Sequence, residues 1–327
     1  MGSHLGRYQI FRGEIFFEKV GETMNYLVYD IGGSYIKFCL MTGDREILLK
    51  GKVKTPLEEK ACFLAVVEEI FQQFEGQVDG IAISMPGKID VYNGYAHSAG
   101  VLTFLEQTNI VDVFHTFTDL PISVENDGKC AALAESWVGA LEHTDHGIVL
   151  VFGTGVGGGL IINNRLHRGY SGIAGEFSFI QQTDACQQPA VYFGAAASVL
   201  SLVSEAERVK GVEKGSLSGE LLFQLIEEGD KELQRVLENY CDTIALHLFN
   251  LQYIFDPETF AIGGGISEQK RFIQEIQKSI DRLKEKHTYQ LAVPKIVPCK
   301  FRNDANLIGA LMNHHLNKVK KIKQNLL

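Results

Sequence analysis

The sequence lacks the cysteine spacing that zinc-binding and disulfide-rich proteins use. Its six cysteines are scattered along the 327 residues, and no Cys-x-x-Cys pair occurs. Closely spaced cysteines are typical of zinc sites, and dense cysteines are typical of small secreted domains. We therefore expect reduced thiols in a cytoplasmic protein.

Long apolar runs and an excess of positive charge are also missing. The longest apolar stretches, such as residues 148–152, fall far short of the roughly 20 residues that a membrane-spanning helix needs. The formal net charge is −9, which argues against nonspecific binding to nucleic acid through a basic surface. We expect neither a membrane nor a nucleic-acid partner.

Proline is scarce, with 7 residues, whereas glycine is mildly in excess, with 33 residues, and is clustered. The clusters are Gly32-Gly33, Gly153 to Gly159 and Gly263 to Gly265. The length of the chain favours two domains, since a domain usually has about 100–200 residues. No Pro/Gly/Ser-rich linker occurs, so we expect the two domains to be closely packed.

Residues 1–23 differ in character from the rest of the chain. Met1-Gly-Ser-His4 resembles an added tag, and Met24 stands immediately before the first strong strand pattern. Charged residues such as Arg7 and Arg12 interrupt the continuous apolar core that a secretory signal needs. We interpret residues 1–23 as a leader or tag-like segment without a part in function.

The pattern of a strand, a glycine turn and a returning strand occurs twice, and each copy opens an α/β half. The paired strands are predicted at 26–29 with 35–41 and at 147–152 with 160–163. Further strands are predicted at 46–54, 78–84, 121–124, 259–262 and 295–299. Apolar residues at helical spacing predict helices over 57–74, 127–139, 190–210, 217–228, 231–255, 267–284 and 305–320. The recurrence predicts a duplicated two-domain α/β architecture.

The glycine clusters fit neither of two familiar phosphate loops. A Walker A loop needs Gly-x4-Gly-Lys-Ser/Thr, and no such string occurs. A dinucleotide fingerprint needs a helix after its glycines, but Leu160-Ile-Ile-Asn163 is too β-branched and too short to open one. Glycine turns between strands still let backbone N–H groups approach an anion closely.

The first glycine turn is accompanied by charged side chains that suit a metal ion and a phosphate. The Asp30 carboxylate can hold Mg²⁺, directly or through water, while the turn amides face a phosphate. Lys37 on the returning strand can add a positive charge to the same phosphate. Gly153-Thr154-Gly155 would clamp the nucleotide phosphates from the other domain. The alternative is that both turns only reverse the chain, although their pairing with Asp30 and Thr154 favours phosphate binding.

Five ordered motifs resemble those of the ROK-family sugar kinases, which belong to the actin/hexokinase-like ATPase superfamily. The motifs are Asp30-Ile-Gly-Gly-Ser, Glu125-Asn-Asp-Gly-Lys-Cys-Ala-Ala, Gly153-Thr-Gly-Val-Gly-Gly-Gly, Ala174-Gly-Glu176, and Phe255-Asp-Pro followed by Ile262-Gly-Gly-Gly265. The resemblance runs from about Met24 to the last predicted helix, so it covers nearly the whole chain.

The resemblance implies a two-domain, actin-like ATPase (ribonuclease H-like) α/β fold, with duplicated mixed sheets flanked by helices and a central cleft for the sugar. A small N-terminal domain would span residues 24–125, and a larger C-terminal domain would span residues 126–304. The helix at 305–320 would pack back on the first domain. We also expect a homodimer.

For the chemistry, the resemblance implies transfer of a phosphoryl group from ATP with Mg²⁺ to a sugar hydroxyl, usually the 6-hydroxyl. Asp127 would be the general base, and Asn126, Asp127, Glu176 and Phe179 would contact the sugar. The nucleotide and its phosphates would meet Asp30, Gly32, Gly33, Ser34, Lys37, Gly153, Thr154, Gly155, Gly263, Gly264 and Gly265. The alternative for Asp127 is a helix-capping residue beside Asn126, since caps are common at helix starts.

Two departures from the family pattern matter. Many members follow Ala-Gly-Glu with x-Gly-His and a three-cysteine zinc cluster, whereas this chain has Glu176-Phe-Ser-Phe179 and then only Cys186. We therefore expect no structural zinc and no sugar-contacting histidine. Phe179 would loosen the demands near the anomeric end of the sugar, and its ring suits stacking against a second ring or an aglycone.

The variant string looks most like the β-glucoside kinases of the family, with glucokinases and N-acetylmannosamine kinases as alternatives. A sugar-sensing ROK regulator without catalysis is the alternative of another class. Such repressors add an N-terminal helix-turn-helix domain, and the segment before Met24 is too short for one.

Overall fold

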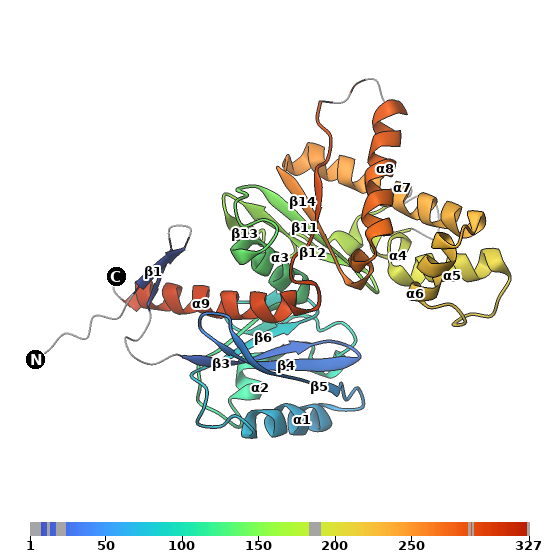
Figure 1. Cartoon of the computed structure of the whole chain (residues 1–327). Coiled ribbons are helices and arrows are strands. Elements are labelled where there is room, and N and C mark those ends of the chain that lie inside the picture. Colours follow the sequence, from blue (N-terminus) through green and yellow to red (C-terminus); the bar gives the residue numbers. More distant parts are fainter. Residues whose placement is uncertain are drawn as a thin grey trace, which may run out of the picture. The chain divides into compact units, whose positions relative to one another are not determined.

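The structure is a computed structural model that describes residues 8–11, 14–17, 24–182, 191–286, 289 and 291–325 (Figure 1). The chain folds into two compact units. Unit 1 holds the chain up to Ala134, Tyr170–Ile173 and the chain from Asp304 onward, and unit 2 holds Glu135–Gly169 and Ala174–Asn303. Within the expected leader the structure has two short paired strands, β1 (Tyr8–Phe11) and β2 (Glu14–Phe17).

Unit 1 is built on a five-stranded mixed sheet with the order β10-β6-β3-β4-β5. β3 and β4 are antiparallel, as are β4 and β5, whereas β6 runs parallel to both β3 and β10. The strands are β3 (Asn25–Ile31), β4 (Tyr35–Thr42), β5 (Ile47–Lys54), β6 (Ile81–Met85) and β10 (Ile122–Asn126).

Alternation along β3 directs its side chains to two different layers. Leu27, Tyr29 and Ile31 join the apolar core with α1 (Lys60–Gln72) and α2 (Ile110–Phe114). Residues at the alternate positions, among them Tyr26 and Asp30, face α9 (Ala305–Asn325). Figure 1 shows α1 and α2 on one face of this sheet and α9 on the other.

A small three-stranded sheet with the order β7-β8-β9 completes unit 1. Its strands are β7 (Ile89–Asp90), β8 (Tyr95–Ala96) and β9 (Thr108–Asn109), with the short helix η1 (Thr103–Leu105) before β9. The sequence patterns predicted neither this sheet nor α2, because elements of two to five residues are too short to show a period.

Unit 2 repeats the topology of unit 1 with different strands. Its sheet has the order β13-β12-β11-β14-β15, in which the first three strands in sequence are antiparallel neighbours and the last two run parallel to the first. The strands are β11 (Gly147–Phe152), β12 (Val156–Ile162), β13 (Arg165–His167), β14 (Thr259–Gly263) and β15 (Ile296–Pro298). In both units the strand order, counted along the chain, is therefore third, second, first, fourth and fifth, which confirms the predicted duplication.

Helices cover the unit 2 sheet and form its core with apolar side chains of β11 and β14. They are α4 (Phe193–Ala196), α5 (Val199–Lys210), α6 (Gly219–Glu227), α7 (Lys231–Phe255) and α8 (Lys270–Lys286), with the short helices η2 (Phe177–Phe179) and η3 (Gly265–Glu268). α3 (Asp127–Val138) begins in unit 1 and ends in unit 2, and η4 (Arg302–Asp304) leads into α9.

The predicted helix over 231–255 is confirmed as α7, whose N-terminus is capped by Asp230. The single helix predicted over 190–210 is wrong, because the structure has α4 and then a separate α5. The Ser198 side chain accepts a hydrogen bond from the Ser201 N–H and starts α5 anew. β12 also begins at Val156, inside the glycine run that was predicted as a turn.

The units divide the chain after Ala134 and not after residue 125, where the family resemblance implied the domain boundary. β10 runs directly into α3, and the first turns of α3 pack on α9, with Gly309 against the Cys130 carbonyl. The start of α3 therefore belongs with the sheet of unit 1.

Candidate active site

The predicted site residues of unit 1 gather at one edge of its sheet. β3, β6 and β10 are parallel neighbours, so their carboxyl ends meet at the same edge. β3 brings Asp30 there, β6 brings Ser84, and β10 brings Asn126 and leads into Asp127.

Asp30 is buried, with 6% of its surface exposed, and its two carboxylate oxygens have different surroundings. Oδ1 accepts hydrogen bonds from the Ser84 hydroxyl at 2.9 Å and from Asn306 Nδ2 at 3.0 Å. Oδ2 lies 3.6 Å from Lys37 Nζ, on the neighbouring strand. Two neutral donors thus orient the carboxylate, and a cation stands beside its second oxygen.

The turn after Asp30 is held by the backbone and by Thr55, a residue that the sequence patterns did not single out. The Gly32 N–H donates to the Tyr35 carbonyl at 3.0 Å. The Thr55 hydroxyl donates to the Gly32 carbonyl at 2.7 Å, and the Thr55 N–H donates to the Ser34 carbonyl at 3.1 Å. These bonds fix the shape of the turn while the Ser34 side chain stays exposed.

Asn126, and not Asp127, caps helix α3. Asn126 Oδ1 accepts a hydrogen bond from the Lys129 N–H at 3.1 Å, which is the usual bond of an N-cap. Asn126 Nδ2 donates to the Gly87 carbonyl at 3.0 Å and to Asp127 Oδ1 at 3.1 Å. Asp127 Oδ1 also accepts from the Gly128 N–H at 2.8 Å. The capping role therefore belongs to Asn126, whose amide also orients the Asp127 carboxylate.

In unit 2 the Gly153-Thr154-Gly155 loop is held by backbone bonds and by one serine. The Gly153 N–H donates to the Gly155 carbonyl at 3.0 Å, and the Gly153 carbonyl accepts from the Val199 N–H at the start of α5 at 2.8 Å. The Ser178 hydroxyl bonds the N–H of Val156 at 2.9 Å and its carbonyl at 3.2 Å. The Thr154 side chain is exposed.

The third glycine cluster follows β14, the parallel neighbour of β11. Gly264 has a φ of +91°, and a Cβ there would lie 2.0 Å from the Phe152 carbonyl oxygen, so only glycine fits. The Ser267 hydroxyl donates to the Gly264 carbonyl at 2.7 Å. The turn therefore lies directly against the end of β11.

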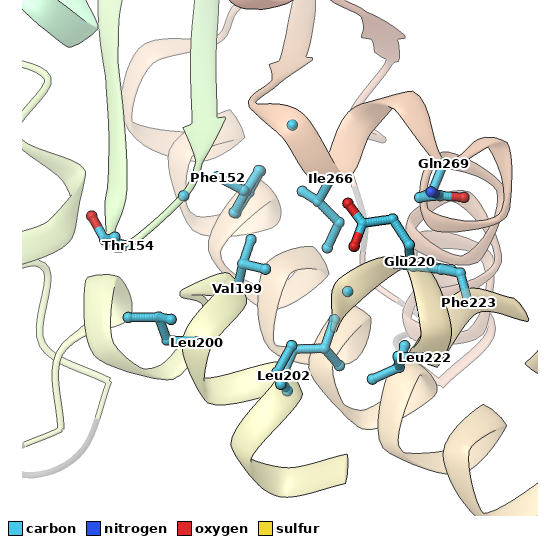
Figure 2. A pocket seen from close by; sticks show the side chains of 14 residues that line it. Phe152, Thr154, Val199, Leu200, Leu202, Glu220, Leu222, Phe223, Ile266 and Gln269 are labelled. Carbon is cyan, nitrogen blue, oxygen red and sulfur yellow. The ribbon is translucent and has the colours of Figure 1, made fainter. Parts of the chain in front are cut away.

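These two glycine clusters border one cavity of about 400 Å³. Figure 2 shows Thr154 at one end of the lining and Glu220, Phe223 and Gln269 at the other. The walls between them come mainly from apolar side chains of β11, η3, α5 and α6, and they are Phe152, Val199, Leu200, Leu202, Val203, Leu222 and Ile266. The volume and the apolar lining are typical of a small-molecule pocket. The sequence patterns named the glycines but not the helical residues of this cavity.

Glu176 stands immediately before the short helix η2 of unit 2, and Phe179 is the last residue of that helix. Glu176 is half-buried, whereas Phe179 has 73% of its surface exposed. Phe177 between them is buried in the core, and Ser178 holds the glycine loop. η2 therefore joins the predicted sugar-binding string to the predicted phosphate loop within one unit.

Among the described residues, no group of three or more histidine, cysteine, aspartate or glutamate side chains is arranged to hold a metal ion. Cys186 lies outside the described residues. No helix within the described part of the chain is both long enough and apolar enough to cross a membrane.

Residues 26–315 match the model of the ROK family. The chain belongs to the ROK family. This ROK chain is 29% identical over 290 residues to the beta-glucoside kinase of Listeria monocytogenes. The aligned residues cover 88% of this chain and 96% of the relative.

Two solved structures share the fold of this ROK chain over most of their length. A ROK family protein from Streptococcus pneumoniae in complex with sucrose is 30% identical, with a TM-score of 0.82 over 92% of this chain and 100% of that one. A ROK glucokinase from Streptomyces griseus in complex with glucose and AMPPNP is 26% identical, with a TM-score of 0.74 over 88% of this chain and 98% of that one. The family and the actin-like ATPase fold inferred from the five motifs are therefore confirmed.

Proposed function

We propose that this ROK protein transfers the γ-phosphoryl group of ATP to the 6-hydroxyl of a glucose-type sugar or β-glucoside, with Asp127 as the general base. The chain is an ATP-dependent carbohydrate kinase by its family and by its sugar-kinase relatives. The finer assignments of substrate and residues are our proposal.

The observation that carries the proposal is the arrangement at the start of α3. Since Asn126 caps the helix, the Asp127 carboxylate is not needed as the cap. The Asn126 amide and the Gly128 N–H both hold Oδ1, so the carboxylate has a defined direction. A general base must be oriented in this way to accept the proton of an attacking hydroxyl. Phosphoryl transfer otherwise depends mainly on positioning and charge stabilisation.

The Asp30 turn suits Mg²⁺ bound together with phosphate. Mg²⁺ is usually held by one or two carboxylates, with waters and phosphate oxygens as the other ligands. Asp30 offers one buried, oriented carboxylate, and Lys37 adds a positive charge for a phosphate. Mg²⁺ bound there would neutralise charge on the transferring phosphoryl group. The amides of Gly32, Gly33 and Ser34 would face the phosphates.

In unit 2 we assign the cavity to the nucleoside and the Gly153-Thr154-Gly155 loop to the phosphates. The loop and Gly265 border the cavity, so phosphate and nucleoside would be continuous. Gly263 and Gly264 complete the turn that lies against the adenosine. Backbone N–H groups of such loops bind anions without a charged side chain.

For the sugar we assign Asn126 and Glu176 to hydroxyl groups and Phe179 to an apolar ring face. The Phe179 ring is largely exposed, as a platform for a second ring or an aglycone needs to be. Together with the likeness to the Listeria monocytogenes beta-glucoside kinase, this favours a β-glucoside over a free monosaccharide. We also propose that the protein is a cytoplasmic homodimer that needs no structural zinc.

The test is sugar-dependent release of ADP from ATP over a panel of glucose, cellobiose, an aryl β-glucoside and N-acetylmannosamine. We expect turnover with the β-glucosides, with the product phosphorylated at the 6-hydroxyl. Turnover with N-acetylmannosamine alone would contradict the proposed substrate class, and turnover with glucose alone would contradict the preference for a β-glucoside. No turnover with any sugar, despite thermal stabilisation by sugar, would identify a sensor and contradict catalysis.

A further inference from the structure

We propose that the Glu220 carboxylate reads the nucleobase of the phosphoryl donor by accepting a hydrogen bond from the 6-amino group of adenine. The inference rests on the proposed function, because it takes the unit 2 cavity as the site of the nucleoside. It adds a residue of α6 that determines which nucleotide is used.

The polar groups of the cavity are few and lie at its two ends. Among the described residues that line it, the polar side chains are those of Thr154, Glu220 and Gln269. Figure 2 shows Thr154 at one end and the Glu220 carboxylate at the other, turned toward Ile266 and into the cavity. In a pocket with apolar walls, a few polar groups set the orientation and identity of the ligand.

The elongated shape of a nucleoside triphosphate decides which end meets the base. With the phosphates at the Gly153-Thr154 loop, the ribose lies between the apolar walls of Val199 and Ile266. The base then reaches the end where Glu220 and Gln269 stand. Glu220 thus meets the edge of the purine and not the phosphates, which its negative charge would repel.

Local hydrogen bonds keep Glu220 ionised and in place. Its own backbone N–H and the Ser218 hydroxyl hold the pKa of the Glu220 carboxyl below its usual range. Ser218 in turn accepts from the Leu221 N–H at 3.1 Å, so its hydroxyl hydrogen is directed away from that bond. The carboxylate is therefore held at the start of α6 by its own backbone N–H and by Ser218, which does not line the cavity.

An ionised carboxylate can only accept hydrogen bonds. Adenine presents an amino donor at its 6-position, whereas hypoxanthine, the base of inosine nucleotides, presents an oxygen acceptor there, as guanine does. A carboxylate that faces the 6-position therefore favours the amino group of adenine over the oxygen of a 6-oxo purine. A glutamine at the same position could donate to the oxygen and would remove this discrimination.

The experiment measures the Kd of ADP and of IDP by calorimetry for the wild-type protein, Glu220→Gln and Glu227→Gln. Glu227 is an exposed carboxylate on the same helix that does not line the cavity, so its change matches the loss of charge. We expect the preference for ADP over IDP to fall about tenfold in Glu220→Gln, because a hydrogen bond to a charged group is lost. The preference should stay unchanged in Glu227→Gln.

An equal preference in the wild-type protein and Glu220→Gln would overturn the proposal. So would an equal weakening of ADP and IDP, since that indicates a structural role for Glu220. The binding measurement does not need phosphoryl transfer. A wild-type protein that binds ADP but forms no ADP from ATP in the presence of any sugar would refute the proposed function. The comparison of ADP and IDP binding would still test Glu220.

Discussion

The two units place the same strand-turn-strand motif in sheets of identical order, yet they hold their turns by different means. The Asp30 turn of unit 1 has a buried carboxylate, a nearby lysine and two side-chain donors. The Gly153 loop of unit 2 has backbone bonds and one serine hydroxyl, and it borders an apolar cavity. A single topology therefore supports a charged site in one unit and an apolar, backbone-lined site in the other.

The difference follows from what each strand end carries. In unit 1 the carboxyl ends of three parallel strands bring polar side chains to one edge. In unit 2 the corresponding ends of β11 and β14 bring glycines, and the helices that follow them supply leucine, valine and isoleucine. Substitutions in unit 1 should therefore act on chemistry, whereas substitutions in unit 2 should act on nucleotide binding and stability.

The largest effect is expected at the charged edge of unit 1. Asp127→Asn keeps the shape of the side chain and an acceptor for the Gly128 N–H, but it removes the carboxylate that we propose as the base. We expect kcat to fall about 10²–10⁴-fold, the usual contribution of a general base, while the Kd of the sugar stays nearly unchanged. Initial rates of ADP release and calorimetry with the sugar measure the two quantities.

Asp44→Asn is the matched control, because Asp44 is an exposed carboxylate on the β4–β5 turn of the same unit. It should keep wild-type kcat. If Asp127→Asn retained more than a few per cent of wild-type kcat, Asp127 would not be the base.

An intermediate effect is expected at the loop of unit 2. Ser178→Ala removes the hydroxyl that bonds the Val156 N–H and carbonyl at the end of the loop. We expect unfolding to require about 1–2 kcal/mol less free energy, because two hydrogen bonds are lost and a backbone N–H loses its partner. The KM for ATP should rise while the KM for the sugar changes little.

Denaturant unfolding and initial rates at varied ATP test this expectation, with Ser216→Ala as the control. Ser216 is exposed and bonds only locally to the Glu213 carbonyl among the contacts seen in the structure. A Ser178→Ala protein with wild-type stability and wild-type KM for ATP would show that the serine does not hold the loop.

The effect that is smallest at neutral pH concerns the apolar interior of unit 2, because it appears only in acid. His247 of α7 is 2% exposed, stacks on Phe193 with ring centroids 3.9 Å apart, and has no hydrogen-bond partner for either ring nitrogen among the described residues. Burial lowers the pKa of His247 to about 4. The unfolded chain takes up this proton near pH 6.5, so stability is lost as the pH falls from about 6.5 toward 4.

At pH 5 this loss should reach roughly 1–2 kcal/mol for His247. His247→Phe should therefore show a smaller drop in stability between pH 7.5 and pH 5 than the wild-type protein, whereas His143→Gln, at an exposed position, should not. Part of the drop should persist, because burial and Lys318 also lower the pKa of His315 in unit 1 to about 4. If the free energy of unfolding fell equally with pH in His247→Phe and in the wild-type protein, His247 would not be buried in its neutral form.

Sequence patterns were sufficient to single out residues that stand next to a recognisable strand or helix pattern. The glycine clusters, Asp30 and the Asn126-Asp127 pair each stand directly after a strand pattern, and the long periodic run of α7 was predicted to the residue. The break between α4 and α5 was not predicted, because apolar spacing continues across Ser198 while its hydroxyl starts a new helix.

The partners of Asp30 could not be predicted, since Ser84 and Asn306 lie 54 and 276 residues away along the chain. Only Ser84 gave a signal, as a polar residue inside the apolar strand β6. The cavity of unit 2 likewise depends on how α5 and α6 pack against β11, which no local spacing encodes. Glu220 follows Gly219 at the start of a short helix and resembles any surface carboxylate in the sequence.

The position of α9 affects how the chain can fold while it is being synthesised. α9 follows all of unit 2 in sequence, yet it covers one face of the unit 1 sheet and supplies Asn306 to Asp30. During synthesis, domains generally fold as their residues leave the ribosome, N-terminal parts first. The face of the unit 1 sheet that α9 covers therefore stays uncovered until unit 2 has been translated. A chain that stops before Ala305 would therefore carry Asp127 and all three glycine clusters but would lack Asn306, one of the two side-chain donors that orient the Asp30 carboxylate.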